Sequence, residues 1–215
     1  MSPRPRKVSD EEVFAAAYRA MNRLGPGELT LAEIAAEAGV TAGALTQRFG
    51  SKRALLLALS EGAAASSGDF LRELRARHRS PLAAVRAWAG CMAHLAQSPA
   101  ALARSLAYLQ VDLTDDDFRR HLTAQARVTR RAIHELLDEA VEVGELVQET
   151  DTKWLARTVE TVLSGSLFTY AHYLEGSAEK WLRDDVEAVL GPWMPRIGKR
   201  APANARPRTA RGRSG

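Results

Sequence analysis

The stretch from Thr30 to Lys52, TLAEIAAEAGVTAGALTQRFGSK, most constrains how this chain can fold. It predicts two short helices joined by a glycine turn, with a third helix beginning near its end. In the first helix, apolar residues recur at helical spacing, and Thr30 with Glu33 predicts a capping box. Gly39 then stands where glycine most easily adopts the left-handed conformation that ends a helix. Together these features predict a helix-turn-helix over about residues 30–49.

The second helix of this pair has a small, uncharged first turn. Thr41 is a favourable N-cap, but Ala44 stands where a capping box would need glutamate. Ala42 and Gly43 complete the turn. Glycine inside a helix costs roughly 1 kcal/mol relative to alanine, and close approach of the backbone to another molecule would offset that cost. The pattern therefore favours a binding role for this helix end.

Two cations begin the next helix. Ser51 can cap it, yet Lys52 and Arg53 fill its first turn, where positive charge opposes the helix dipole. A phosphate bound at that end would reverse the sign of the effect. We predict that the second helix enters a DNA groove; the alternative is an ordinary helical hairpin in an all-α domain. The residues expected to contact DNA are Thr30, Thr41, Ala42, Gly43, Ala44, Thr46, Gln47, Arg48 and Lys52.

Residues 9–60 resemble the DNA-binding domain of the tetracycline-repressor (TetR) family. After a first helix, the similarity lies in T-L-A-E-I-A-A-E-A-G-V-T-A-G-A-L and then F-G-S-K-R-A-L-L. The resemblance implies a bacterial transcriptional regulator that acts as a dimer, with a helical C-terminal domain. Thr46 and Arg48 stand where the family usually has an aromatic residue and often histidine. The basic residue that many members carry near Ala42 is absent, which implies fewer phosphate contacts from this helix.

The charge of the chain is concentrated at its ends. Its formal net charge is +4, with 30 Lys and Arg residues against 26 Asp and Glu. Ten of the basic residues lie within residues 1–8 and 196–215, so the remaining body has a net charge of −6. We expect a basic flexible arm that reaches DNA and a disordered basic tail. The tail either adds salt-sensitive attraction to DNA or is an idle solvated end.

Composition favours a cytoplasmic, non-catalytic protein. Cys91 is the single cysteine and is expected in the core. No apolar run reaches the length of a membrane span, and acidic residues instead of a hydrophobic signal region follow the basic N-terminus. Phosphate loops, nucleophile elbows and paired cysteine ligands are absent from the sequence, and its histidines lack metal-ligand spacing. We therefore expect no enzymatic activity, no cofactor and no metal.

Helix start signals organise the rest of the chain. Ser9 with Glu12 predicts a capping box and a first helix that ends near Leu24. Two Ser-Pro pairs, at residues 80–81 and 98–99, place proline at the first position of a helix. Acidic residues after Thr114 suit the start of a long helix that ends near Gly144. The small residues from 62 to 68 suggest a hinge.

These signals predict an all-α protein without strands. An N-terminal three-helix helix-turn-helix DNA-binding domain over residues 9–60 follows a basic arm over 1–8. A helical bundle for ligand binding and dimerisation over 61–195 precedes the tail over 196–215.

The last two helices, over about 152–174 and 178–194, are predicted to pair with a second subunit. The first is apolar or small on two faces, so it must be buried on two sides. The resemblance implies the same pairing, as a four-helix bundle. A two-fold dimer suits a palindromic operator in double-stranded DNA; a monomer with a thick core is the alternative. The expected interface residues are Thr158, Thr161, Gly165, Trp181, Val186, Val189, Leu190 and Trp193.

A cavity for a small apolar or amphipathic ligand is predicted in the body. Polar Gln125 and Thr129 interrupt an otherwise apolar helix stripe, and an apolar cavity with a few polar groups is the usual small-molecule site. Core packing is the alternative for each residue taken singly. The expected lining residues are Trp88, Met92, Tyr108, Phe118, Gln125, Thr129, Val162 and Phe168.

The sequence therefore predicts a dimeric repressor that a small molecule releases from DNA. The competing hypothesis is a helical ligand-binding or interaction protein whose DNA-binding head does not function.

Overall fold

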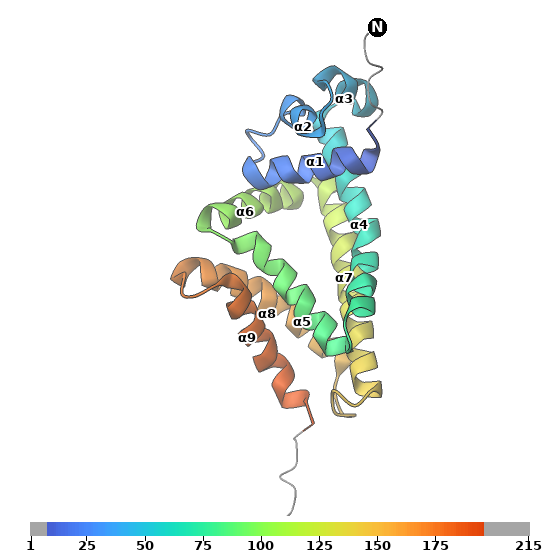
Figure 1. Cartoon of the computed structure of the whole chain (residues 1–215), viewed down its shortest axis with the longest axis vertical. Helices are drawn as coiled ribbons and strands as arrows, with labels where there is room; N and C mark the ends of the chain where they lie inside the picture. The colour runs from blue at the N-terminus through green and yellow to red at the C-terminus, as the bar shows by residue number, and fades with distance from the viewer. Residues whose placement is uncertain (1–7, 196–215) are drawn as a thin grey trace, which may run out of the picture.

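The computed structural model describes residues 8–195, and this part of the chain holds helices and no strands (Figure 1). The predicted all-α fold is confirmed. Residues 1–7 and 196–215, which hold the predicted tail and all of the predicted arm except Val8, lie outside the described residues. No helix in the described range combines the length and apolarity needed to cross a membrane. The elements are α1 (Asp10–Arg23), α2 (Leu31–Ala38), α3 (Ala42–Phe49), α4 (Lys52–Arg77), α5 (Pro81–Met92), η1 (Ala93–Ala96), α6 (Pro99–Thr114), α7 (Asp116–Glu142), α8 (Thr152–Tyr173), α9 (Ala178–Leu190) and η2 (Gly191–Trp193).

Short polar side chains begin the first helices, as predicted. At α1 the capping box is complete: the Glu12 amide donates to Ser9 Oγ over 3.2 Å, and the Ser9 amide donates to the Glu12 carboxylate over 2.9 Å. The box predicted at α2 is only half formed. Thr30 accepts a hydrogen bond from the Glu33 amide at 3.1 Å, but the Glu33 carboxylate lies 3.7 Å from Arg23. That ion pair ties α2 to α1.

Helices α1, α2 and α3 and the start of α4 form a small domain, the head, with its own apolar core. Gly39 ends α2 in the left-handed conformation, with φ +71°, as predicted. This tight turn reverses the chain so that α3 packs against α2 within the head. The residues at the centre of the head core, each at most 2% exposed, are Val13, Ile34, Leu45 and Leu55.

Helix α4 runs without a break from the head into the body, where it lies along α7 (Figure 1). The hinge predicted over residues 62–68 is not formed, because the whole stretch is helical. Gly68 is buried, and a β-carbon added to it would lie 3.0 Å from Val128 Cγ1 on α7. Glycine therefore serves close helix packing at this point. The predicted domain boundary after residue 60 lies inside α4, so a helix joins head and body.

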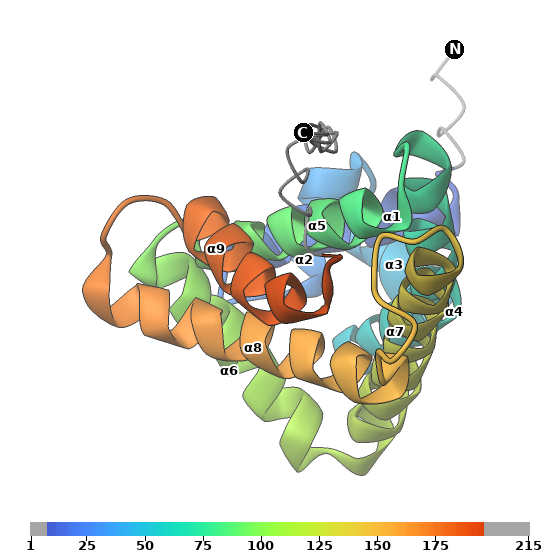
Figure 2. The same ribbon diagram turned by 90° about the horizontal axis from the view of Figure 1, so that it is seen from below.

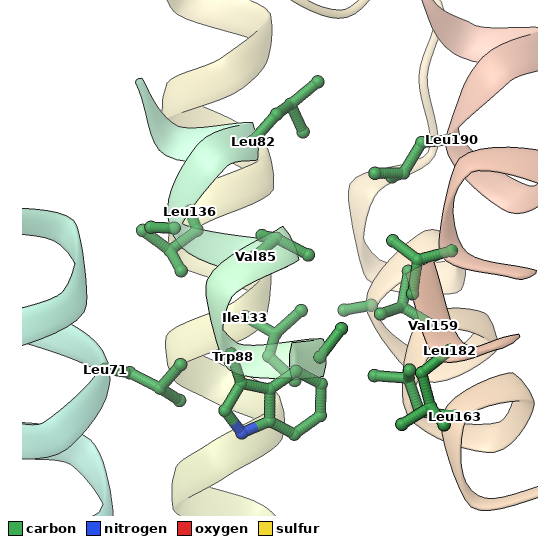
Figure 3. Packing of buried hydrophobic residues seen from close by; sticks show 14 of the residues in the cluster. Leu71, Leu82, Val85, Trp88, Ile133, Leu136, Val159, Leu163, Leu182 and Leu190 are labelled. Carbon is green, nitrogen blue, oxygen red and sulfur yellow. The ribbon is translucent and has the colours of Figure 1, made fainter. Parts of the chain in front are cut away.

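The rest of the described chain forms the body, which packs around α5. This helix packs against α4, α7 and α9, and Leu82 and Val85 project from it into the core (Figure 3). Ile133 of α7, Val159 of α8 and Leu182 of α9 meet them there with no exposed surface. Full burial of each such side chain contributes roughly 1.5–3 kcal/mol. The apolar body core thus holds α5, α7, α8 and α9 together.

The two glycines of α4 give a prediction about its packing. Replacing Gly62 with alanine should raise the free energy of unfolding by about 0.5–1 kcal/mol, because alanine favours the helix and Phe14, the nearest neighbour, is 3.9 Å from the new β-carbon. Replacing Gly68 with leucine should lower it by about 1–3 kcal/mol, because the side chain would overlap Val128. Urea unfolding at one protein concentration measures both. Unchanged stability of Gly68→Leu would contradict the close packing of α4 on α7.

Candidate nucleic-acid interface and ligand cavity

The first turn of α3 is free of acidic side chains, and its Gly43 and Ala44 are exposed whereas Ala42 is half-buried. Thr41 caps it by accepting a hydrogen bond from the Ala44 amide at 3.2 Å. A β-carbon added to Gly43 would meet only Thr41 Oγ1, 3.9 Å away, so packing inside the described chain does not require glycine here. The small turn leaves an external group free to approach the Ala42 and Gly43 amides. Such a helix end attracts anions.

The rest of α3 divides into an anchoring face and an outward face. Leu45 is buried and Phe49 half-buried, whereas Thr46 and Gln47 are exposed. The Thr46 hydroxyl donates to the Ala42 carbonyl over 3.0 Å, which leaves its oxygen able to accept a hydrogen bond. Gln47 makes no hydrogen bond within the described residues, so its amide is free. An amide side chain of this kind can donate and accept at a base edge.

Arg48 is tied to the start of the described chain. Its guanidinium donates to the Val8 carbonyl over 2.7 Å and forms an ion pair with Asp10. It also lies over the Phe49 ring, 5.5 Å from the centroid. These contacts hold the segment before α1 against α3. The sequence did not predict this role for Arg48.

Lys52 is also occupied within the chain. Its ammonium donates to the Pro26 carbonyl at 3.1 Å and to the Leu29 carbonyl at 2.8 Å. The side chain therefore fastens the loop between α1 and α2 to the start of α4. The predicted phosphate contact would require it to leave these two acceptors. The sequence holds no specific signal for this role beyond the Gly-Pro-Gly turn, which predicts a non-helical loop that holds one of the two acceptors, the Pro26 carbonyl.

Arg53 connects the head to the beginning of α7. Its guanidinium donates to the Asp115 and Asp117 carboxylates at distances down to 2.8 Å. These hydrogen bonds lower the pKa of both carboxyls and raise the pKa of Arg53. Phe118 lies beneath, with its ring centroid 5.7 Å from the guanidinium carbon. Phe118, which we predicted to line the ligand cavity, thus belongs to this joint.

Tyr108 makes a second connection between head and body. Its hydroxyl donates to the Leu24 carbonyl at the end of α1 over 2.8 Å. Burial, with a smaller effect of the Glu28 charge, raises the pKa of Tyr108 to about 12. The hydroxyl therefore stays protonated near neutral pH and keeps its donor. Helix α6, which carries Tyr108, is thereby fastened to the head.

A mostly apolar cavity of about 470 Å³ lies among α5, α6, α7 and α8. A second hollow of about 450 Å³ adjoins it and shares several of its lining residues, and Tyr18 and Phe70 also line this hollow. Val162, another predicted lining residue, is half-buried elsewhere on α8. The structure brings six of the eight predicted lining residues together around the first cavity: Trp88, Met92, Tyr108, Gln125, Thr129 and Phe168.

The predicted interface residues beyond position 178 pack against the body core of their own subunit; they are Trp181, Val186, Val189, Leu190 and Trp193. Val186 and Leu190 are 0% exposed, so a partner could not touch them without opening that core. Trp181 stacks on Tyr173 with the ring centroids 5.9 Å apart. The apolar surface of α9 therefore serves the fold of one subunit.

Helix α8 keeps a second, outward face. Thr161 and Gly165 are exposed and Thr158 is half-buried. Two large apolar side chains accompany them, since Trp154 is 50% and Phe168 45% exposed. Figure 2 shows α8 and α9 side by side, with α8 extending across the molecule toward α7. The outward face of α8 is the part of the predicted interface that remains accessible on the described surface.

Among residues 8–195, no three His, Cys, Asp or Glu residues are grouped so as to hold a metal ion. Cys91, which we expected in the core, is exposed on α5. It faces the hollow that adjoins the cavity.

The head matches a known family. Residues 13–59 match the family model of the bacterial regulatory proteins of the tetR family. This range covers most of α1, all of α2 and α3, and the beginning of α4. No curated protein sequence matches the chain.

Solved structures share the fold of nearly the whole chain. A TetR transcription regulator from Haloarcula marismortui superposes with a TM-score of 0.67 at 19% identity, covering 86% of this chain and 98% of its own. SCO0520, a TetR transcriptional regulator from Streptomyces coelicolor, gives 0.65 at 23%, covering 87% and 99%. SmeT, the repressor of the Stenotrophomonas maltophilia multidrug efflux pump SmeDEF, gives 0.62 at 20%, covering 89% and 93%. The body thus shares the architecture of TetR regulators.

The role of Lys52 can be tested through stability. Replacing Lys52 with methionine should lower the free energy of unfolding by about 1–3 kcal/mol, because two loop carbonyls lose a charged donor. Replacing Lys153, which is exposed, with methionine is the control and should change it by less than about 0.5 kcal/mol. Urea unfolding measures both. Equal effects of the two substitutions would show that the loop does not depend on Lys52.

The Arg53 joint predicts a pH-dependent stability. Because the folded protein lowers the pKa of Asp115 and Asp117, the joint stabilises the fold above the ordinary aspartate pKa of about 3.9 and loses that effect as the pH falls. Arg53→Met should therefore be less stable than the unsubstituted protein at neutral pH, and the difference should shrink below about pH 4. Urea unfolding across pH measures this difference.

Arg77→Met is the matched control, because Arg77 pairs with Glu73 inside the same helix and joins no second element. Its effect should be small throughout. A difference between Arg53→Met and the unsubstituted protein that stays constant down to the lowest pH would contradict an ionic joint.

Proposed function

We propose that this chain, a TetR-family regulator by its matched head and its fold, is a dimeric repressor that binds a palindromic operator and leaves it when a small molecule occupies the body. One observation carries the DNA-binding part of the proposal. The first turn of α3 lacks acids, exposes Gly43 and Ala44, and has at Gly43 a glycine that no contact within the described chain requires. Close approach of a DNA phosphate backbone to this turn would account for a glycine at this position.

In the proposed complex, different groups of the head have different roles. The Ala42 and Gly43 amides donate to a backbone phosphate, which the end of the helix dipole favours. Gln47 contacts a base edge, since its amide is not used inside the described chain. Arg48 and Lys52 act indirectly, by holding the segment before α1 and the loop before α2. The other outward residues of this surface are Thr41, Ala44 and Thr46.

Dimerisation is proposed through the outward face of α8. Its exposed Trp154 and Phe168 offer apolar area, and Thr161 and Gly165 between them are small enough for a partner helix to approach closely. The proposed two-fold axis is one that places both heads on the same side of the dimer. Each head would then read a half-site, with the two half-sites about 34–36 Å apart.

Release by a ligand is proposed to pass through α6. This helix lines the cavity and carries Tyr108, whose hydroxyl is bonded to the end of α1. A ligand that displaces α6 would therefore also shift the end of α1 in the head, through this hydrogen bond. To convert almost all molecules from the bound to the released form, the ligand must favour the released form by roughly 5.5 kcal/mol.

Gly43→Glu separates helix stability from DNA binding. A glutamate in the first turn should stabilise α3, because it complements the helix dipole and replaces glycine. It should also weaken binding to the DNA upstream of the protein's own gene by more than about tenfold, because its charge repels the phosphate. Fluorescence anisotropy with labelled duplex measures the affinity, and urea unfolding measures the stability.

Ala100→Glu is the matched control. Ala100 occupies the same second position of α6, is exposed, and lies in a first turn without acids. This change adds the same charge to the body and should leave DNA affinity within about twofold, given salt screening over about 10 Å. Equal DNA affinities of Gly43→Glu and the unsubstituted protein would refute the proposed use of the α3 terminus.

A further inference from the structure

One carboxylate stands out among the residues that line the cavity. Asp112 is on α6, one turn beyond Tyr108, and is half-buried. The wall around it is mostly apolar and includes the aromatic side chains of Trp88, Tyr108 and Phe168. Placing an ionised carboxylate in such surroundings is unfavourable unless a positive group compensates it.

Asp112 has no compensating group in the described chain. It forms no ion pair and no hydrogen bond there, and burial alone raises the pKa of its carboxyl. The nearby Tyr18 has its own pKa raised, first by burial and then by the Asp112 charge. The other acid of the cavity wall, Glu160, is already neutralised by Arg130, 2.5 Å away. Of the two acidic residues that line the cavity, Asp112 is therefore the one whose charge no group of the described chain compensates.

We propose that the cavity selects amphipathic organic cations, with the Asp112 carboxylate facing the positive charge and the aromatic wall holding the apolar part. This assignment specifies the ligand class of the regulator proposed above. Cation binding in the cavity stands independently of that function, and only the effect of the cation on DNA binding rests on it. Three features support it together. The cavity has the volume of a drug-sized molecule, its aromatic rings can attract a cation through their faces, and its wall carries one uncompensated acid.

Two hydrophobic ions of equal shape and opposite charge test the proposal. Tetraphenylphosphonium is the cation and tetraphenylborate the anion, and isothermal titration calorimetry gives the affinity of the full chain for each. The unsubstituted protein should bind the cation at least about tenfold more tightly than the anion. In Asp112→Asn, which preserves the side-chain shape, cation affinity should fall by about tenfold or more and the preference should largely disappear.

Asp116→Asn is the control for net charge. Asp116 is exposed at the start of α7 and pairs with Arg119, so its loss removes one negative charge without changing the cavity. Its cation affinity should stay within about twofold of that of the unsubstituted protein. Circular dichroism verifies that both variants fold. If Asp112→Asn fails this check, Asp112→Glu, which keeps the charge, should retain the preference for the cation.

The outcomes separate the ligand class from the proposed function. Equal or tighter binding of tetraphenylborate, or unchanged cation affinity in Asp112→Asn, overturns the assignment to cations. Anisotropy with the upstream duplex is recorded on the same samples without either probe. Cation selectivity that depends on Asp112 in a protein that binds no duplex would support the ligand class and refute the repressor. Duplex binding without cation selectivity would refute the ligand class alone.

Discussion

The close packing of α4 against α7 is the contact on which the rest of the structure depends. The head core includes Leu55 of α4, and the body core includes Leu71 of the same helix. One helix therefore belongs to two cores. From Gly68 to the start of α4 the helix rises roughly 24 Å, so a tilt of about 5° at its contact with Val128 would move the head by about 2 Å. Small changes in the body are thus enlarged at the DNA-binding surface.

Two polar contacts join the head to the body beside α4. Tyr108 bonds to the end of α1, and Arg53 bonds to the start of α7. Polar contacts at a partly exposed joint exchange with water at little net cost, because water replaces each lost hydrogen bond. Apolar cores do not have this freedom, since opening them exposes apolar surface. The molecule therefore combines two stable cores with a joint that can rearrange, which is what the proposed release from DNA would require.

The sequence predicted the features that depend on interactions between residues close together in the chain. Serine and threonine before the helices and glycine after α2 satisfy backbone groups a few residues away, so the helix starts and the helix-turn-helix could be predicted closely. Contacts between distant segments could not. Small residues around Gly68 are compatible with flexibility or with close packing, and only the position of α7 decides between them. Periodicity showed that Val186 and Leu190 are buried, but it could not show that their own subunit buries them. Lys52 satisfies carbonyls of an earlier loop, which its position in a helix did not reveal.

The same contacts limit how the head can attract DNA. Each basic residue between positions 8 and 60 is held by a group of its own chain; these residues are Arg19, Arg23, Arg48, Lys52 and Arg53. Surface ion pairs contribute only about 0–1 kcal/mol, so Arg19 and Arg23 can exchange their carboxylates for phosphates at little cost. Lys52 cannot do so without freeing two carbonyls. Affinity that rests on helix-end amides responds weakly to salt, because only neutralised phosphates release counterions. For the proposed DNA complex, we therefore expect the salt-sensitive share of the affinity to come from exchangeable arginines and from the basic residues at the two ends of the sequence.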